Sequence, residues 1–175
     1  MEYAILGWPP DGPTLDLDHE RFAYAGKFVM SSTGKAVARE DGDLVAAVAF
    51  NEDRTDADAL WLRYVTVRAD RRGDGIGPRL CRTVVDAALD RGYDRIRIAV
   101  NNSFAYEALH KVGFGFTGEE TGIAELVLEY PAEPDRAAYQ AGLDRYRERD
   151  LTEAEAQFLA DRETADPPEA IDPSS

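Results

Sequence analysis

The stretch RRGDGIGPRL, residues 71–80, places glycines at three alternate positions, Gly73, Gly75 and Gly77. Glycine at every second position suits neither a helix nor a strand, because it loses much backbone entropy on folding and adds no packing. The segment before it, LWLRYVTVR (60–68), is rich in β-formers, and the apolar residues after it recur at helical spacing. A glycine loop between a strand and a helix predicts an anion site, because free amides and the helix dipole both favour negative charge there.

The residues around the glycines exclude two common phosphate loops. A nucleotide P-loop ends in Gly-Lys-Ser/Thr, whereas Gly77 is followed by Pro78 and Arg79. The dinucleotide pattern G-x-G-x-x-G, begun at Gly73, requires a glycine where Pro78 stands. Proline is tolerated there because the first helical turn needs no donor from it. The pattern that remains is R-x-x-G-x-G, from Arg72 to Gly77.

Strand and helix patterns alternate through most of the chain. The expected strands are residues 2–8, 34–40, 44–50, 60–68, 95–100 and 124–130. The expected helices are residues 76–91 and 103–112, each followed by a glycine. Asp41-Gly42-Asp43 predicts a tight hairpin turn between the second and third strands. Residues 14–31 are ambiguous between a short helix and a loop.

This arrangement resembles the GCN5-related N-acetyltransferases, the GNAT family. YVTVRADRRGDGIG (64–77) is similar to the family's strand and pyrophosphate loop, and NNSFAYEALHKVGF (101–114) is similar to its second cofactor-binding segment, with N-x-x-A followed by K-x-G-F. The resemblance is specific over residues 60–118 and plausible over 35–130. It implies an α/β (α+β) fold with a mixed, largely antiparallel central sheet flanked by helices, and acetyl-CoA as the cosubstrate.

The resemblance assigns the pyrophosphate of the coenzyme to the backbone amides of the loop. The loop residues are Arg72, Gly73, Asp74, Gly75, Ile76 and Gly77. The pantetheine arm would pair with the strand segment Val65, Thr66 and Val67, and the amide of Val67 would stabilise the oxyanion that develops on the thioester. Asn102 would hydrogen-bond the same arm, although its place before a helix also suits an N-cap. Asp74 stands where the family often has a basic residue, and we expect its carboxylate to face solvent.

The implied reaction is direct attack of a primary amine on the acetyl thioester in a ternary complex, which needs a neutral amine and is helped by a proton donor for the thiolate. The tyrosine that donates a proton in the family corresponds to Leu109 here, so the resemblance does not identify the proton donor. Tyr106, one turn earlier, is a candidate cofactor-binding residue, and it is either a substitute donor or a packed aromatic. His110 points about 100° away from Leu109 on a helix. The candidates for the base are Glu52, Asp58 and Tyr64. The alternative function is an acyl-CoA-binding or sensing module, or a subunit of low activity, without its own amine substrate.

The charge of the chain is strongly negative. There are 34 acidic and 20 basic residues, a formal net charge of -14, and only 3 of the basic residues are lysines. An acidic surface could steer a cationic substrate, or it could be adapted to the salt-rich cytoplasm of a halophilic organism. Either interpretation excludes non-specific nucleic-acid binding, because phosphate contacts need a basic face.

The sequence predicts a cytoplasmic protein without a membrane segment or metal. No apolar run approaches the roughly 18 residues of a membrane helix. The start, MEYAILGWPPDGP (1–13), has neither a basic region nor a long apolar segment, so it does not predict secretion. Cys81 is the single cysteine, which excludes an internal disulfide, and no ligand cluster for a metal is evident.

Prolines after residue 130 predict an acetyltransferase domain over residues 1–130 and an acidic extension over 131–175. The extension should hold one helix over 135–149 and a second that opens with a capping box at Thr152 and Glu155. We expect it to be helical to about residue 163 and disordered beyond. Its 12 acidic residues and 5 arginines fit a solvated tail or a helical segment that packs on a second subunit, which would make the protein a homodimer.

Overall fold

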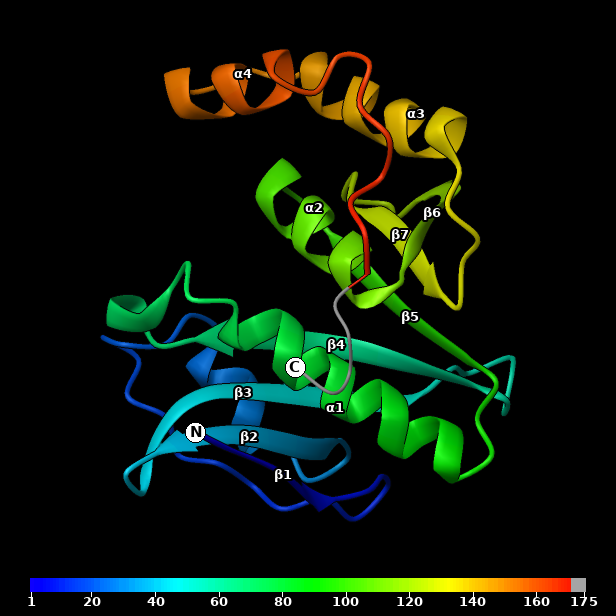
Figure 1. Cartoon of the computed structure of the whole chain (residues 1–175). Coiled ribbons are helices and arrows are strands. Elements are labelled where there is room, and N and C mark those ends of the chain that lie inside the picture. The colour runs from blue at the N-terminus through cyan, green and yellow to red at the C-terminus, as the bar shows by residue number, and fades with distance from the viewer. Residues whose placement is uncertain (171–175) are drawn as a thin grey trace. The chain divides into compact units, whose positions relative to one another are not determined.

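Seven strands form one sheet in the order β1-β2-β3-β4-β5-β7-β6, as seen in a computed structural model that describes residues 1–170 (Figure 1). The pairs β1–β2, β2–β3, β3–β4 and β6–β7 are antiparallel. The predicted mixed, largely antiparallel sheet flanked by helices is therefore confirmed. The part of the predicted disordered end that falls on residues 171–175 lies outside the described residues.

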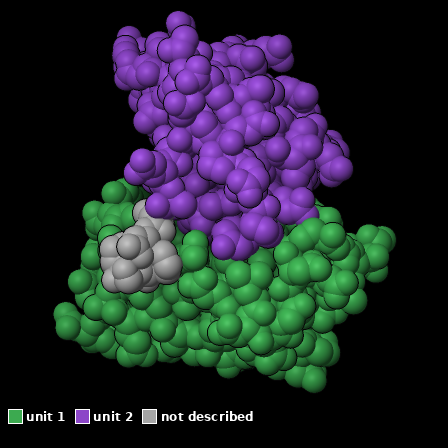
Figure 2. Space-filling view, turned by 45° about the vertical axis from the view of Figure 1, so that its right-hand side comes forward, with its two compact units in different colours: residues 1–97 green, residues 98–175 purple. Residues whose placement is uncertain are grey.

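The chain divides into two compact units, Met1–Arg97 and Ile98–Ser175 (Figure 2). The division falls within strand β5 (Arg95–Val100), whereas the sequence analysis placed its boundary at residue 130. The strands after β5 and the two C-terminal helices belong together in the second unit.

In the first unit, four antiparallel strands follow one another along the chain and across the sheet. They are β1 (Glu2–Gly7), β2 (Gly34–Glu40), β3 (Asp43–Glu52) and β4 (Ala59–Val67). The turn between β2 and β3 is confirmed: Asp41 and Gly42 both have positive φ, 52° and 86°, as a two-residue hairpin turn requires. The ambiguous residues 14–31 form a loop with one short 3-10 helix, η1 (Ala25–Val29).

The two faces of these strands are covered differently. Helix α1 (Ile76–Asp90) packs on one face of β1 to β4 and buries Leu80, Val84 and Ala88 (Figure 1). The loop that carries η1 covers the other face with Leu17, Phe22 and Phe28. Strand β4 is therefore packed from both sides. A second 3-10 helix, η2 (Ala69–Arg71), follows it and leads into the glycine loop.

The second unit contains helix α2 (Ser103–Val112) and the antiparallel pair β6 (Gly115–Glu120) and β7 (Leu126–Tyr130). Strand β6 was not predicted. Its sequence, GFTGEE, has two glycines and two glutamates and no apolar alternation, and four of its six residues are exposed. It lies at the edge of the sheet, where polar residues are tolerated because only one side must pair.

The C-terminal helices are α3 (Arg136–Arg147) and α4 (Glu153–Ala160), and the predicted capping box at Thr152 and Glu155 is confirmed. Helix α3 packs against β6 and buries Tyr139, Leu143 and Tyr146 almost completely. The expectation of a solvated tail is therefore wrong for α3, which is part of the core of the second unit.

Candidate functional site

The glycine loop joins η2 to α1 and contains two residues in the left-handed region. Gly73 has φ 87° and Gly75, the N-cap of α1, has φ 77°. Other residue types adopt this conformation only at a cost of about 1–2 kcal/mol, so glycine at these two positions is explained by backbone geometry. A Cβ atom at either position would meet no other atom within 4 Å, so the space around both is open.

Part of this loop leaves its amides unused by the described chain. Residues 72 and 73 form a turn after η2, whereas within residues 1–170 no residue accepts a hydrogen bond from the amides of residues 75–77. The first backbone hydrogen bond of α1 runs from the amide of Arg79 to the carbonyl of Gly75, at 3.3 Å. Side chains do not cap the helix either. A run of free amides at a helix N-terminus is a ready-made site for an anion.

Gly77 has a different role from the other two glycines. It is buried within α1, and a Cβ atom there would lie 3.2 Å from Cγ2 of Val67 on β4. The absence of a side chain lets the first turn of α1 approach the strand closely. Gly77 thus positions the helix N-terminus, and its amide is the group available to a ligand.

The charged side chains of the loop pair mostly with each other. Arg71 forms ion pairs with Glu40 and, at 3.2 Å, with Asp74. Asp74 was expected to face solvent; it is half-exposed and its carboxylate turns to Arg71. Arg72 is exposed, and no carboxylate of the described residues pairs with it. Nε of Arg72 donates weakly to the carbonyl of Val67 at 3.5 Å, so its two Nη groups are the ones available to an anion at the loop.

Side chains alternate between the two faces of strand β4. Val67 faces α1, whereas Tyr64 packs in the opposite core under the η1 loop. Thr66 is buried, and its hydroxyl has no hydrogen-bond partner within residues 1–170. The pairing with β3 shifts register, because Ala49 and Phe50 pair with residues 64 and 62 and leave Arg63 as an extra residue. This β-bulge was not predicted; bulges often occur beside active sites, where they re-aim groups.

Asn102 lies in the second unit and caps α2, as the sequence allowed. Its Oδ1 accepts a hydrogen bond from the amide of Ala105 at 2.8 Å. Its Nδ2 lies 3.3 Å from Oδ1 of Asn101, which uses one of its two N–H groups. The capping role and the predicted cofactor role use different atoms of one side chain, so they are compatible.

Tyr106 is fully buried in the second unit. Its hydroxyl donates to the carbonyl of Tyr139 at 2.9 Å, and its ring packs against His110, Tyr139 and Tyr146. Burial raises the pKa of this phenol well above its usual value. This packing favours the interpretation of Tyr106 as a packed aromatic over its interpretation as a proton donor. A proton donor also cannot be Leu109, which has no polar group.

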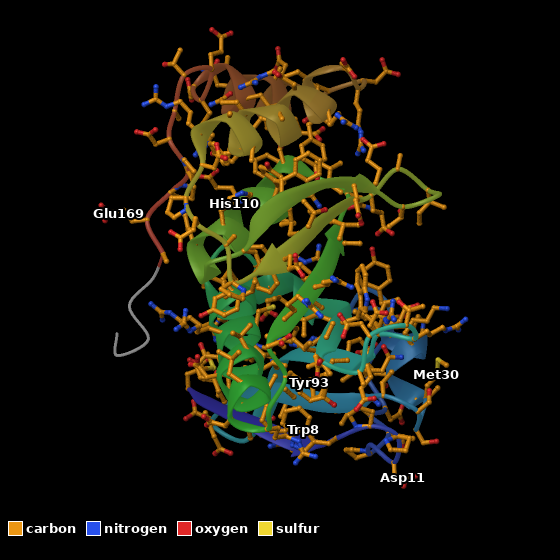
Figure 3. All side chains as sticks on the ribbon, turned by 90° about the vertical axis from the view of Figure 1, so that its right-hand side faces the viewer. Trp8, Asp11, Met30, Tyr93, His110 and Glu169 are labelled. Carbon is orange, nitrogen blue, oxygen red and sulfur yellow. The ribbon has the colours of Figure 1, made fainter. Side chains whose placement is uncertain are left out.

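Two other candidates for proton transfer, His110 and Glu52, have side chains that are already hydrogen-bonded. Nδ1 of the buried His110 donates to the carbonyl of Tyr106 at 2.8 Å, and burial lowers its pKa (Figure 3). Glu52 accepts from the hydroxyl of Tyr93 at 2.7 Å. The backbone amide of Asp58 donates to the carboxylate of Asp56 at 3.0 Å. None of these contacts defines a base.

Neither a metal-ligand cluster nor a membrane-spanning helix is found among the described residues. Within residues 1–170, no group of three or more histidine, cysteine, aspartate or glutamate side chains is placed to hold a metal ion. No helix in the same range has the length and apolar character needed to cross a bilayer.

Comparison with known proteins finds one family. A sequence model described as the acetyltransferase (GNAT) family matches residues 3–114. A Xenopus tropicalis protein named "Probable N-acetyltransferase camello" is 34% identical over 96 residues, which is 54% of this chain and 43% of the relative. The matched region thus spans less than half of that relative's length.

Solved acetyltransferases share the fold. A GCN5-related N-acetyltransferase from Kribbella flavida is 25% identical, with a TM-score of 0.50 over 57% of this chain and 68% of that one. Nourseothricin acetyltransferase is 19% identical, with a TM-score of 0.53 over 75% of this chain and 98% of that one. The yncA protein of Salmonella typhimurium, solved with its cofactor acetyl-CoA, is 17% identical, with a TM-score of 0.51 over 58% of this chain and 66% of that one.

Proposed function

The chain belongs to the acetyltransferase (GNAT) family, and we propose that it transfers the acetyl group of acetyl-CoA to a primary amine. The observation that carries this proposal is the glycine loop, whose amides at residues 75–77 have no acceptor within residues 1–170. A pyrophosphate is a doubly anionic group that fits such a set of donors, and the open space around Gly73 and Gly75 leaves room for it.

The residues of this chain would bind and orient the cosubstrate. The loop amides and Arg72 would hold the pyrophosphate, the backbone of Val65 to Val67 would pair with the pantetheine arm, and Asn102 Nδ2 would donate to it. The amide of Val67, or of a neighbour on β4, would stabilise negative charge on the thioester oxygen. Thr66, with its unpaired hydroxyl, lies on the same strand segment.

The reaction needs little acid catalysis from the protein. The neutral amine forms a C–N bond with the acetyl carbon, the C–S bond breaks, and the proton that nitrogen loses goes to water while the thiolate takes one up. A thiol has a pKa of about 8.5, so the thiolate is a tolerable leaving group near neutral pH. The absence of a tyrosine at Leu109 is therefore compatible with turnover.

A second function is an acyl-CoA-binding module without its own amine substrate. Leu109 at the position of the family's acid, and the buried, hydrogen-bonded hydroxyl of Tyr106, favour it. The two functions share the cosubstrate site and differ only in whether an amine accelerates thiol release.

The test is to follow free thiol with acetyl-CoA and a panel of amines in molar salt. Cys81 will not interfere, because it is fully buried and burial raises its pKa to about 12. We expect at least one amine to accelerate thiol release. Tight binding of acetyl-CoA without any amine-dependent release would favour the binding module, and no binding at all would reject both.

A further inference from the structure

One side chain from the last turn of α3 and one from just beyond the helix reach the point where β5 ends. The hydroxyl of Tyr146 donates to the carbonyl of Val100 at 3.2 Å, and Nη1 of Arg149 donates to the carbonyl of Asn101 at 3.1 Å. These carbonyls are consecutive, and Asn102 follows them directly. All of these residues lie in the second unit.

The guanidinium of Arg149 bridges two loops. Its Nη2 donates to the carbonyl of Ala124 at 2.5 Å, in the turn between β6 and β7, while Nη1 holds Asn101. Its Cζ lies 4.8 Å from the centre of the Tyr146 ring, so the two side chains also hold each other. A planar fork with several donors can span both carbonyls at once, which a lysine ammonium on a flexible stem does less well.

Tyr146 is a fixed donor. Its side chain is 2% exposed, and burial raises the pKa of its hydroxyl, so the proton is retained. A buried carbonyl that loses its partner is costly, so the hydrogen bond to Val100 restrains the end of β5 strongly.

The conformation of Asn102 depends on this junction. Asn102 has extended backbone angles, φ -147° and ψ 156°, and its Oδ1 is committed to the amide of Ala105. With Oδ1 fixed, the direction of Nδ2 follows from the backbone of residues 100–102. If that backbone moves, the remaining N–H of Nδ2 no longer points in one direction.

We propose that Tyr146 and Arg149 are positioning residues, which fix the β5–α2 junction so that Asn102 presents its side-chain amide to the pantetheine arm of the cosubstrate. The inference rests on the proposed function for the identity of the ligand. Both residues lie outside the matched family region, residues 3–114.

The test compares two buried tyrosines on one helix. Tyr146→Phe removes the donor to Val100, whereas Tyr139→Phe removes a hydroxyl that donates to Glu107, away from the junction. One hydrogen bond is worth about 0.5–1.5 kcal/mol, so we expect the Kd for acetyl-CoA, measured by calorimetry, to rise about 2- to 13-fold in Tyr146→Phe. Tyr139→Phe should change it less than about twofold, with a comparable loss of thermal stability.

A second pair uses two partly exposed arginines, so it does not depend on a buried variant folding. Arg149→Lys should weaken acetyl-CoA binding. Arg145→Lys is the matched control, because Arg145 pairs with Glu120 at 2.7 Å and does not contact the junction. Equal affinities in the two lysine variants, or in the two phenylalanine variants, would overturn the inference.

A measurement without cosubstrate separates this inference from the proposed function. Hydrogen exchange of the Ala105 amide, which Asn102 caps, should accelerate in Tyr146→Phe relative to Tyr139→Phe. If the wild-type protein fails to bind acetyl-CoA, the proposed function fails, and faster exchange would still support the positioning of the junction. Unchanged exchange at Ala105 would refute the positioning role whatever the ligand.

Discussion

Replacing Gly75 by alanine tests whether the glycine loop binds the cosubstrate, and the effect of the substitution on stability can be estimated in advance. Gly75 has φ 77°, so an alanine there pays the strain of the left-handed region, about 1–2 kcal/mol. No atom lies within 4 Å of the new Cβ, so no clash adds to this cost. For a chain of this size we expect the melting temperature to fall by about 2–8 °C.

The effect on the ligand should be larger than the effect on stability. The new methyl group would stand beside the free amides at residues 75–77, where we place the pyrophosphate. A hydrogen bond to a charged group contributes about 1.5–3 kcal/mol, so losing one should weaken acetyl-CoA binding about 10- to 100-fold.

Gly42→Ala is the matched control. Gly42 lies in the β2–β3 turn with φ 86° and open space around its Cβ position, so the backbone strain is the same and the site is elsewhere. Calorimetry with acetyl-CoA, combined with thermal unfolding, separates the two effects. Equal affinity in the two variants would show that the loop does not hold the cosubstrate.

Three further predictions concern stability. Gly142→Ala on α3 should lower the free energy of unfolding by about 1–3 kcal/mol, because a Cβ there would clash with the Tyr106 hydroxyl. The control Gly122→Ala, which has open space around it, should change the free energy of unfolding by less than about 0.5 kcal/mol. Similar melting temperatures in the two variants would contradict this packing. Burial lowers the pKa of His110, so the folded state binds fewer protons than the unfolded state, and the free energy of unfolding should fall as pH drops below 6.5. His110→Gln should reduce this pH dependence, measured by chemical unfolding between pH 5 and 7, whereas the same substitution at the exposed His19 is the control. An unchanged pH dependence in His110→Gln would contradict the prediction. The net charge is -14, so salt should screen the repulsion between acidic side chains, and the melting temperature should rise between 0.1 and 1 M KCl. A melting temperature that stays constant or falls would show that this repulsion is not the dominant charge effect.

Local patterns predicted the elements that surround the site. The strand over residues 60–68, the glycine loop, the helix from Ile76 and the N-cap at Asn102 each depend on a few neighbouring residues, and all were found. Strand β6 was missed because an edge strand does not need apolar alternation. The bulge at Arg63 depends on register with β3, and no residue type in LWLRYVTVR marks it.

The environment of side chains was less predictable than their elements. Tyr106 could be a proton donor or a packed aromatic by helical spacing alone, and only the contact with Tyr139 on α3, far along the sequence, favours packing. The burial of α3 was likewise hidden, because a charged helix with Tyr139, Leu143 and Tyr146 on one side has too few apolar residues to demand a partner. Asn102 shows the opposite case, since the sequence suggested two roles and the structure leaves room for both.

The central claim is that the amides of RRGDGIGPRL bind the pyrophosphate of acetyl-CoA. The most direct measurement is amide NMR of the wild-type protein titrated with coenzyme A and, separately, with pantetheine, which lacks the pyrophosphate. We predict that coenzyme A shifts the amides of Gly73, Gly75 and Gly77 downfield, as new hydrogen bonds to phosphate require, and that pantetheine does not. Saturable binding of coenzyme A that leaves these three amides unmoved would contradict the account.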